Sequence, residues 1–510
     1  MSDSLRLRSA FGLVLLSQFF FMPPCSLAAD GGTSIQAGDG LRGMVDVPIA
    51  KGPDVPTIGV SVNRFMDDPQ RTDDRLPAAD RLLPGEMASA PCPAGQAAVQ
   101  ELSLEGAIDL ALCNSPLIQS AWAAIKVQSA AVGEAKAAYL PVVSAGFTRS
   151  SDRTTYPGIG SAKSTQVGNS SNAGVNWRLF DFGGRAASRQ GAEDLLNAAI
   201  ASHDASIQKA LESAVAAYFD AQSAKAAFTA KQEGESLARE TFESSRRRES
   251  HGAGSRTETL QAQAGLAKAA LERSRAHGDV LKSMAELIYA LGLPPATDVT
   301  LATDLADDAR DLGPELTQWL AEAQAAHPAI LAARAQLAAA RERVTEAESA
   351  GRPTLDASLN FYRNGRPSEG LSAFQTTERV VALTLNVPLF DGYSTLYKVR
   401  GARAEVEQRA ADLQDLSHQI SLDVLKAHAD AVAALDNLDL SRSLVSATQS
   451  AMESVRQRFD HGASDILEML SAQAALADAR QQQVRCLAEW RSARLRMLAA
   501  AGQLGHANLH

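Results

Sequence analysis

Four segments of the chain alternate apolar and polar positions with a period of two: 142–149, 173–180, 354–362 and 380–388. Apolar residues recur at every second position, and mostly small or polar residues stand between them. Such alternation predicts β-strands that have one apolar and one polar face.

Four longer segments repeat apolar residues every three or four positions: 183–250, 257–291, 392–459 and 465–501. This spacing predicts long helices, the first of them about 100 Å long at roughly 1.5 Å per residue. Its coiled-coil seam consists of Ile207, Leu211, Val215, Tyr218 and Gln222. Glycine-containing turns separate the helices in pairs, so two helical hairpins are expected.

The second half of the chain repeats the first. Leu179-Phe180-Asp181 returns as Leu389-Phe390-Asp391, and the glycine turns recur at the same shift of 210 positions (389 minus 179). A period of this length is too long for a solenoid and indicates a duplicated unit. We therefore predict two structural repeats, at 101–296 and 314–503.

The N-terminal region differs in kind from the repeats. Residues 1–28 combine basic residues, a short apolar run and small residues before Ala28, a pattern typical of a cleaved signal peptide. Residues 29–100 are about one quarter Gly and Pro and predict an extended or disordered arm. Cys25 lacks the small preceding residues of a lipid-modified cysteine, and Cys113 and Cys486 are expected to be small packing residues in helices.

Strand length and strand number together indicate a membrane protein. Strands of about 9–11 residues, apolar outside and polar inside, suit an outer-membrane barrel. Four strands cannot close a barrel, so the chain must associate; two copies would supply eight strands and three would supply twelve. The fold class is therefore mainly α with a small transmembrane β part. The alternative is a soluble coiled-coil protein with incidental hairpins.

The duplicated order of helices and strands, the sequence Asn386-Val387-Pro388-Leu389-Phe390-Asp391-Gly392 and the glycine turns resemble the TolC family of outer-membrane export ducts. The resemblance covers about residues 101–503. It implies a homotrimer with a twelve-stranded β-barrel that continues into a periplasmic α-helical barrel. It also implies a periplasmic adaptor protein and an inner-membrane ABC transporter or proton-driven pump as partners, besides outer-membrane lipid.

The same resemblance assigns candidate functional residues. Acidic side chains ring the periplasmic gate in the family; Glu258 and Glu468 occupy such positions, Asp465 lies one turn earlier, and Ser471 replaces a further acid. A ring of like charges selects cations, although acids also favour the first turn of any helix. The hairpin turns are the expected adaptor contacts, at Gly252, Ala253, Gly462 and Ala463. Asp181 and Asp391 are expected to cap the helices that follow the strands.

The remaining chemistry of the sequence favours transport. No nucleophile elbow, HExxH motif, phosphate loop or metal-ligand spacing is present, so we expect neither an enzyme nor a cofactor. The net charge of −10 argues against nucleic-acid binding, and Arg246-Arg247-Arg248 is interpreted as a solvated face. The leading hypothesis is a passive exit duct for type I secretion of a protein such as a toxin. The alternatives are an efflux duct for small molecules and a periplasmic adaptor.

Overall fold

The computed structural model describes residues 99–156, 162–302, 313, 315–365, 375–461 and 463–504. The predicted signal peptide, the predicted arm up to residue 98, and Gly462 lie outside the described residues. Within the described ranges, no helix is long and apolar enough to cross a bilayer.

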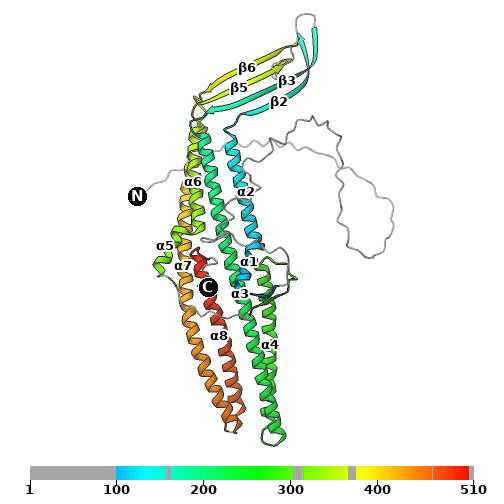
Figure 1. The fold of residues 1–510 in the computed structure, drawn as a ribbon, viewed down its shortest axis with the longest axis vertical. Helices are drawn as coiled ribbons and strands as arrows, with labels where there is room; N and C mark the ends of the chain where they lie inside the picture. The colour runs from blue at the N-terminus through cyan, green and yellow to red at the C-terminus, as the bar shows by residue number, and fades with distance from the viewer. Residues whose placement is uncertain are drawn as a thin grey trace, which may run out of the picture. The chain divides into compact units, whose positions relative to one another are not determined.

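Each repeat has two short helices, two strands and two long helices (Figure 1). The first repeat contains α1 (Leu104–Asn114), α2 (Pro116–Ala137), β2 (Val142–Tyr156), β3 (Ala162–Phe180), α3 (Gly184–Ser250) and α4 (Arg256–Ala290). The second contains α5 (Leu316–Ala326), α6 (Pro328–Ser349), β5 (Thr354–Arg363), β6 (Thr377–Asn386), α7 (Ser394–Asp460) and α8 (Ile466–Ala500). The strands lie at one end of the helices, and the α3–α4 and α7–α8 turns lie at the other (Figure 1).

The four strands form one antiparallel sheet in the order β2-β3-β5-β6, so β2 and β6 are its edges. The register places the apolar positions of all four strands opposite one another, because Val143 pairs with Val175, Val175 with Leu359, and Leu359 with Val381. Directly paired residues share a face of a sheet. One face is therefore apolar and the other carries Ser, Thr, Asn, Arg and Asp.

The first two strands are longer than the sequence predicts. They were expected at 142–149 and 173–180, whereas β2 has 15 residues and β3 has 19. Their additional residues are mostly Ser, Thr, Asn, Gly and Lys, which have no apolar alternation to detect. Continuous pairing from Val142–Asn176 to Tyr156–Ala162 nevertheless makes them one hairpin, because backbone hydrogen bonds form a ladder whatever the side chains are.

A small sheet beside the long helices was not predicted from the sequence pattern. Strand β1 (Val99–Leu102) pairs in parallel with β4 (Val299–Leu301), which lies between the two repeats. Residues 99 and 100, which the sequence pattern assigns to the arm, belong to this strand. The pairing joins the start of the first repeat to the segment that follows α4.

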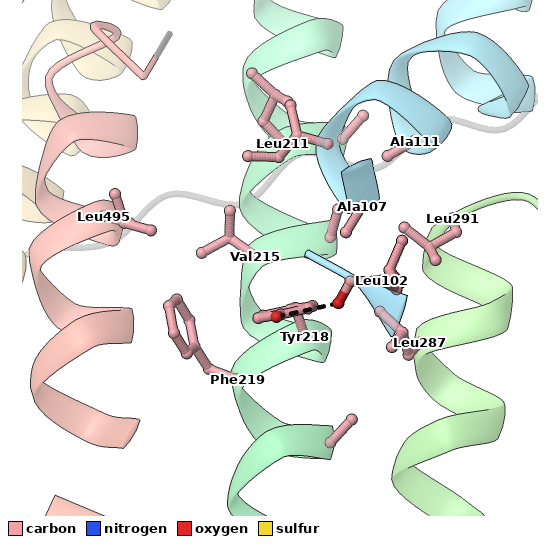
Figure 2. Packing of buried hydrophobic residues seen from close by; sticks show 14 of the residues in the cluster. Leu102, Ala107, Ala111, Leu211, Val215, Tyr218, Phe219, Leu287, Leu291 and Leu495 are labelled. Carbon is pink, nitrogen blue, oxygen red and sulfur yellow. Dashed lines mark hydrogen bonds between the residues drawn. The ribbon is translucent and has the colours of Figure 1, made fainter. Parts of the chain in front are cut away.

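The main hydrophobic core lies where α1, β1, β4, α3, α4 and α8 meet (Figure 2). The predicted seam of α3 supplies Leu211, Val215 and Tyr218, which are at most 4% exposed. The Tyr218 hydroxyl donates to the Leu102 carbonyl oxygen at 3.3 Å, so the one polar atom of this ring is satisfied. Burial of the seam fixes the long helices against the small β1–β4 sheet.

One prediction about the cysteines is wrong. Cys113, in the last turn of α1, forms a disulfide bond rather than acting as a simple packing residue. Its partner lies outside the described residues. Cys486 is free, and Cys25 and Cys92 are the other cysteines of the chain.

Candidate functional site

The turn between α3 and α4 is closed by the backbone. The Ala253 and Gly254 amides donate to the Arg248 carbonyl oxygen at 2.9 and 3.1 Å, and Gly252 has a φ of +74°. Glycine adopts this left-handed conformation without the steric cost of a side chain. Ser255 then caps α4, because its hydroxyl accepts a hydrogen bond from the Glu258 amide at 3.2 Å.

The turn between α7 and α8 has the same construction. The Ala463 amide donates to the Arg458 carbonyl oxygen at 2.8 Å, as Ala253 does to Arg248 in the first turn. Asp465 caps α8, and its carboxylate accepts from the Glu468 amide at 2.7 Å. Asp465 is thus occupied at a helix start, where an acidic side chain is favoured by the exposed amides and the helix dipole.

The carboxylate of Glu468 is held by an ion pair. The Arg458 Nη2 atom donates to its two oxygens at 2.6 and 2.5 Å, and the Ser464 hydroxyl donates to Oε2 at 2.5 Å. The side chains of Arg458 and Glu468 remain 50% and 41% exposed. A charge-assisted pair of this geometry fixes the carboxylate and neutralises it, so the negative potential expected at this position is reduced.

The two other candidate gate residues have different surroundings. Glu258 is half-buried in the first turn of α4. Ser471 is exposed on α8, close to one helical turn beyond Glu468. The four candidate gate residues are therefore one acid in an ion pair, one acid that caps a helix, one acid in a first turn and a serine.

The two hairpins are joined near their turns by Arg248. Its guanidinium stacks 4.8 Å above the centre of the Phe459 ring, and Nη1 donates to the Phe459 carbonyl oxygen at 3.4 Å. Phe459 is 4% exposed. The interpretation of residues 246–248 as a solvated face is therefore wrong for Arg248. No local sequence pattern predicts this contact, because the two residues are 211 positions apart.

Two further polar contacts join α3 to α8 above the turns. The Gln473 side-chain amide donates to the Thr241 hydroxyl at 2.6 Å, and Arg480 pairs with Glu233 at 3.1 Å. A cavity of about 590 Å³ lies beside them, between α3, α4 and α8, and small residues form much of its lining. These contacts and the Arg248–Phe459 contact are here called the hairpin latch.

The strand-to-helix junctions are held by the two predicted aspartates, although neither is the N-cap residue. The N-caps of α3 and α7 are Gly183 and Tyr393. The Asp181 carboxylate nevertheless accepts from the Arg185 amide at 2.9 Å, and Asp391 accepts from the Thr395 amide at 2.7 Å. Hydrogen bonds from Thr395 also lower the pKa of Asp391 from its ordinary value.

The polar face of the sheet carries one ion pair near the helices. The Arg178 Nε atom lies 2.9 Å from the Asp356 carboxylate, and Asp356 also accepts from Thr354 at 3.3 Å. No group of three or more His, Cys, Asp or Glu residues with metal-binding geometry occurs in the part of the chain that the structure describes. Arg178 and Asp356 compensate each other's charge on this face.

An open sheet with one apolar face, long helices on one end of it and paired hairpin turns at the far end define a subunit of an outer-membrane channel. The family described as outer membrane efflux protein matches residues 107–293 and 319–503. The chain belongs to this family. It is therefore an exit duct in the outer membrane whose helices extend into the periplasm, and the expected fold class is confirmed.

Individual relatives and solved structures agree with this assignment. The chain is 37% identical over 421 residues to Protein CyaE of Bordetella pertussis, which is 82% of this chain and 88% of that protein. It is 26% identical to the alkaline protease secretion protein AprF of Pseudomonas aeruginosa, over 53% of this chain and 56% of AprF. The outer-membrane channel OprN has a TM-score of 0.66 at 18% identity and covers 84% of this chain and 96% of its own. VceC of Vibrio cholerae has a TM-score of 0.68 at 18% identity, with 78% and 96% covered.

Proposed function

We propose that three copies of the chain form a passive exit duct for type I secretion of a protein. The open sheet is the main observation that supports a trimer, because its edge strands β2 and β6 have no partner strand among the described residues. Lipid does not tolerate unpaired backbone groups, so β6 of one copy must pair with β2 of the next. Two copies would give an eight-stranded barrel filled by side chains, whereas three give twelve strands and a lumen.

Exposed apolar stripes on the helices support the same assembly. On α4, Leu260, Leu271, Leu281 and Tyr289 are 52–86% exposed and follow a coiled-coil spacing together with the small residues between them. On α7, an exposed stripe consists of Leu422, Leu425, Val432, Leu440 and Leu444. Each stripe lies on a helix whose other side already packs against its hairpin partner. A neighbouring copy would bury both stripes and close the helices into a barrel.

The hairpin turns are the proposed gate and docking surface. Glu258, Asp465 and Glu468 would surround the constriction, and Ser471 would leave it less acidic than a complete ring. Gly252, Ala253, Gly462 and Ala463 would contact a periplasmic adaptor, which links the duct to an inner-membrane ABC transporter. The hairpin latch holds the gate closed until the adaptor engages. The duct itself performs no catalysis in this proposal.

Secretion of a protein is favoured by the relatives. AprF is described as a secretion protein for an alkaline protease, and the chain is similar to it over about half of its length. The second candidate function is small-molecule efflux, because the matched family and the Brucella suis relative BepC are both described as efflux proteins. Both functions use the same duct and differ in the inner-membrane pump.

Deletion of the gene separates the two functions. If the duct serves type I secretion, the culture medium should lose one or a few specific proteins, and complementation should restore them. Drug susceptibility should stay close to that of the parent strain. An unchanged set of secreted proteins combined with drug hypersensitivity would reject secretion in favour of efflux. Cysteines at Ala253 or Ala463 should cross-link to the adaptor during export, and no adduct in exporting cells would remove these turns from the docking surface.

A further inference from the structure

The two strand hairpins of the sheet extend to different distances from the long helices. Pairing between β3 and β5 stops at Ser171 and Arg363, whereas pairing between β2 and β3 continues to Tyr156 and Ala162. The β2–β3 hairpin therefore extends beyond β5 and β6, at the end of the sheet away from the helices (Figure 1). Because the helices extend into the periplasm, this end faces the cell exterior. It is here called the outer end and consists of residues 149–156, 162–171, 362–363 and 377–379.

The apolar face of the sheet becomes cationic at the outer end. Residues two positions apart in a strand share a face, and so do directly paired residues. Arg149 follows Phe147 by two positions, and Arg379 pairs with Phe361. The same rule places five exposed cations on the face that is apolar nearer the helices. They are here called the cationic stripe: Arg149, Arg153, Lys163, Arg363 and Arg379.

The acidic residues of the outer end lie on the opposite face. Asp152 is one position from Arg153 on β2, and Glu378 is one position from Arg379 on β6, so their side chains point to the other side of the sheet. Both acids are partly buried, whereas the cations are exposed. A surface that only faces water commonly mixes both signs of charge. Here the positive charge lies on the one face that continues from the lipid-facing surface.

The charge of the cationic stripe is not compensated by its neighbours on the same face. The residues directly paired with the five cations are uncharged: Asn169, Thr165, Thr155, Ser171, Thr377 and Phe361. The Arg379 guanidinium lies over the Phe361 ring, 5.9 Å from its centre. The ion pair between Arg178 and Asp356 lies at the other end of the sheet and on the opposite face. The stripe is therefore open to an external anion.

The length of the stripe indicates the size of the anionic partner. Arg153 is six positions beyond Phe147, which is about 20 Å along the strand. A strand tilt of about 40° reduces this height above the apolar band to about 15 Å. The headgroups of a phospholipid layer add only about 5–8 Å on each side of the hydrocarbon. The stripe thus extends further than a phospholipid headgroup and suits a large one.

The chemistry of the stripe indicates phosphate groups. Arginine binds phosphate through two parallel hydrogen bonds, and lysine binds it as a point charge. Four of the five cations are arginines. In outer membranes the outer leaflet consists of lipopolysaccharide, a large glycolipid whose headgroup carries phosphates. A surface that is apolar first and cationic beyond matches such a lipid, with its acyl chains below and its phosphates above.

We propose that the cationic stripe binds the phosphorylated headgroup of lipopolysaccharide in the outer leaflet. Arg149, Arg363 and Arg379 contact the phosphates next to the acyl chains, whereas Arg153 and Lys163 contact groups further from the membrane. The β2–β3 hairpin extends beyond β5 and β6 because it follows this headgroup outward. The proposal depends on the placement of the sheet in the outer membrane, and it applies whether the duct exports proteins or small molecules.

Titration of the purified full-length protein with fluorescent lipopolysaccharide tests the proposal. The protein is held in zwitterionic detergent, and a second lipopolysaccharide sample is dephosphorylated. Arg149→Gln combined with Arg153→Gln should weaken binding of the phosphorylated form about 25-fold, because each cation near an anionic lipid contributes roughly a fivefold factor. The matched control is Arg246→Gln combined with Arg247→Gln, which removes two exposed arginines from α3 and should leave binding unchanged.

Three results would overturn the proposal. The unsubstituted protein could bind both forms of lipopolysaccharide equally, or the two double variants could lose affinity equally. Inorganic phosphate could displace the bound lipid completely when sodium chloride of the same ionic strength does not, which would assign the stripe to small anions. If the Arg149 and Arg153 variant forms no trimer, the two forms of lipopolysaccharide on the unsubstituted protein decide the question. Normal trimers and normal export without selective binding would reject this inference alone and leave the proposed duct intact.

Discussion

Removal of the Arg458 guanidinium should expose the charge of Glu468 to the pore without unfolding the tip. Arg458 is the basic residue in the last turn of α7, and both partners of its ion pair are about half exposed. Exposed ion pairs contribute about 0–1 kcal/mol to stability. We therefore expect Arg458→Ala to lower the free energy of unfolding by at most about 1 kcal/mol.

The electrostatic effect on permeating ions should be larger than the effect on stability. A cation about 8 Å from one uncompensated carboxylate gains roughly 0.5 kcal/mol in water and about 2 kcal/mol at an effective dielectric constant near 20. A trimer would place three such carboxylates around one axis. Since about 1.4 kcal/mol corresponds to a factor of ten, cation selectivity should rise several-fold.

Planar bilayers measure this change through the reversal potential in a KCl gradient. Arg458→Ala should shift the potential toward that of a cation-selective pore, and Glu468→Gln should shift it the other way. The shift should shrink at about 1 M salt, where the screening length is near 3 Å. The double variant Arg458→Ala, Glu468→Gln decides the cause, because it removes both charges of the ion pair and should restore the reversal potential of the unsubstituted protein. If the double variant instead behaves like Arg458→Ala, the guanidinium acts through the shape of the tip, and the electrostatic reasoning is refuted.

Three further predictions follow from individual contacts. The substitution Arg248→Ala should weaken the hairpin latch and increase the frequency of channel opening in planar bilayers. The control is Arg246→Ala, because Arg246 is exposed and should not affect opening. Equal effects of the two substitutions would mean that only the net charge of this region matters. His327 caps α6 by accepting a hydrogen bond from the Ala329 amide, and burial lowers the pKa of His327, so the native state favours its neutral form. The unfolding temperature should therefore fall as the pH drops from about 7.5 to 5.5. The substitution His327→Asn should reduce this pH dependence. Non-reducing peptide mapping should recover Cys113 linked to Cys92 once residues 1–28 are removed. The substitution Cys113→Ser should lower the free energy of unfolding by about 3 kcal/mol, the value for a closed loop of roughly 20 residues. It should also abolish the effect of a reducing agent on stability.

The long helices and the apolar parts of the strands could be predicted because their signal is periodic. The predicted helix 183–250 and α3 (Gly184–Ser250) differ by one residue at the start. By contrast, the polar extension of β2 beyond residue 149 and the short pair β1–β4 are specified by backbone pairing between distant segments, which no local period records. The resemblance proposes Glu468 as a candidate, but it does not indicate Arg458 or Arg248, because a resemblance transfers positions and not contacts.

The two repeats follow the same backbone path, but the side-chain contacts that hold them in place differ between the repeats. At the first junction, Arg185 pairs with Asp181, donates to the carbonyl oxygens of Ala138, Arg178 and Leu179, and stacks over Tyr139. The residue 210 positions later is Thr395, whose short side chain cannot make these contacts. Among the described contacts it hydrogen-bonds only to Asp391. The first repeat is thus tied firmly to the sheet.

The second repeat carries its own restraint at the opposite end. The Arg458–Glu468 pair closes the α7–α8 turn, and the hairpin latch joins that hairpin to α3 beside a buried apolar cluster that includes Phe459. The polar contacts of the latch can be exchanged for water at small cost, whereas the apolar cluster at the tips and the buried seam of α3 cannot. Because the α3 side is bound to both the core and the sheet, we expect loss of the latch to loosen the α7–α8 tip more than the α3–α4 tip. This unequal anchoring of the two repeats predicts that the α7–α8 tip moves further than the α3–α4 tip when the latch is lost.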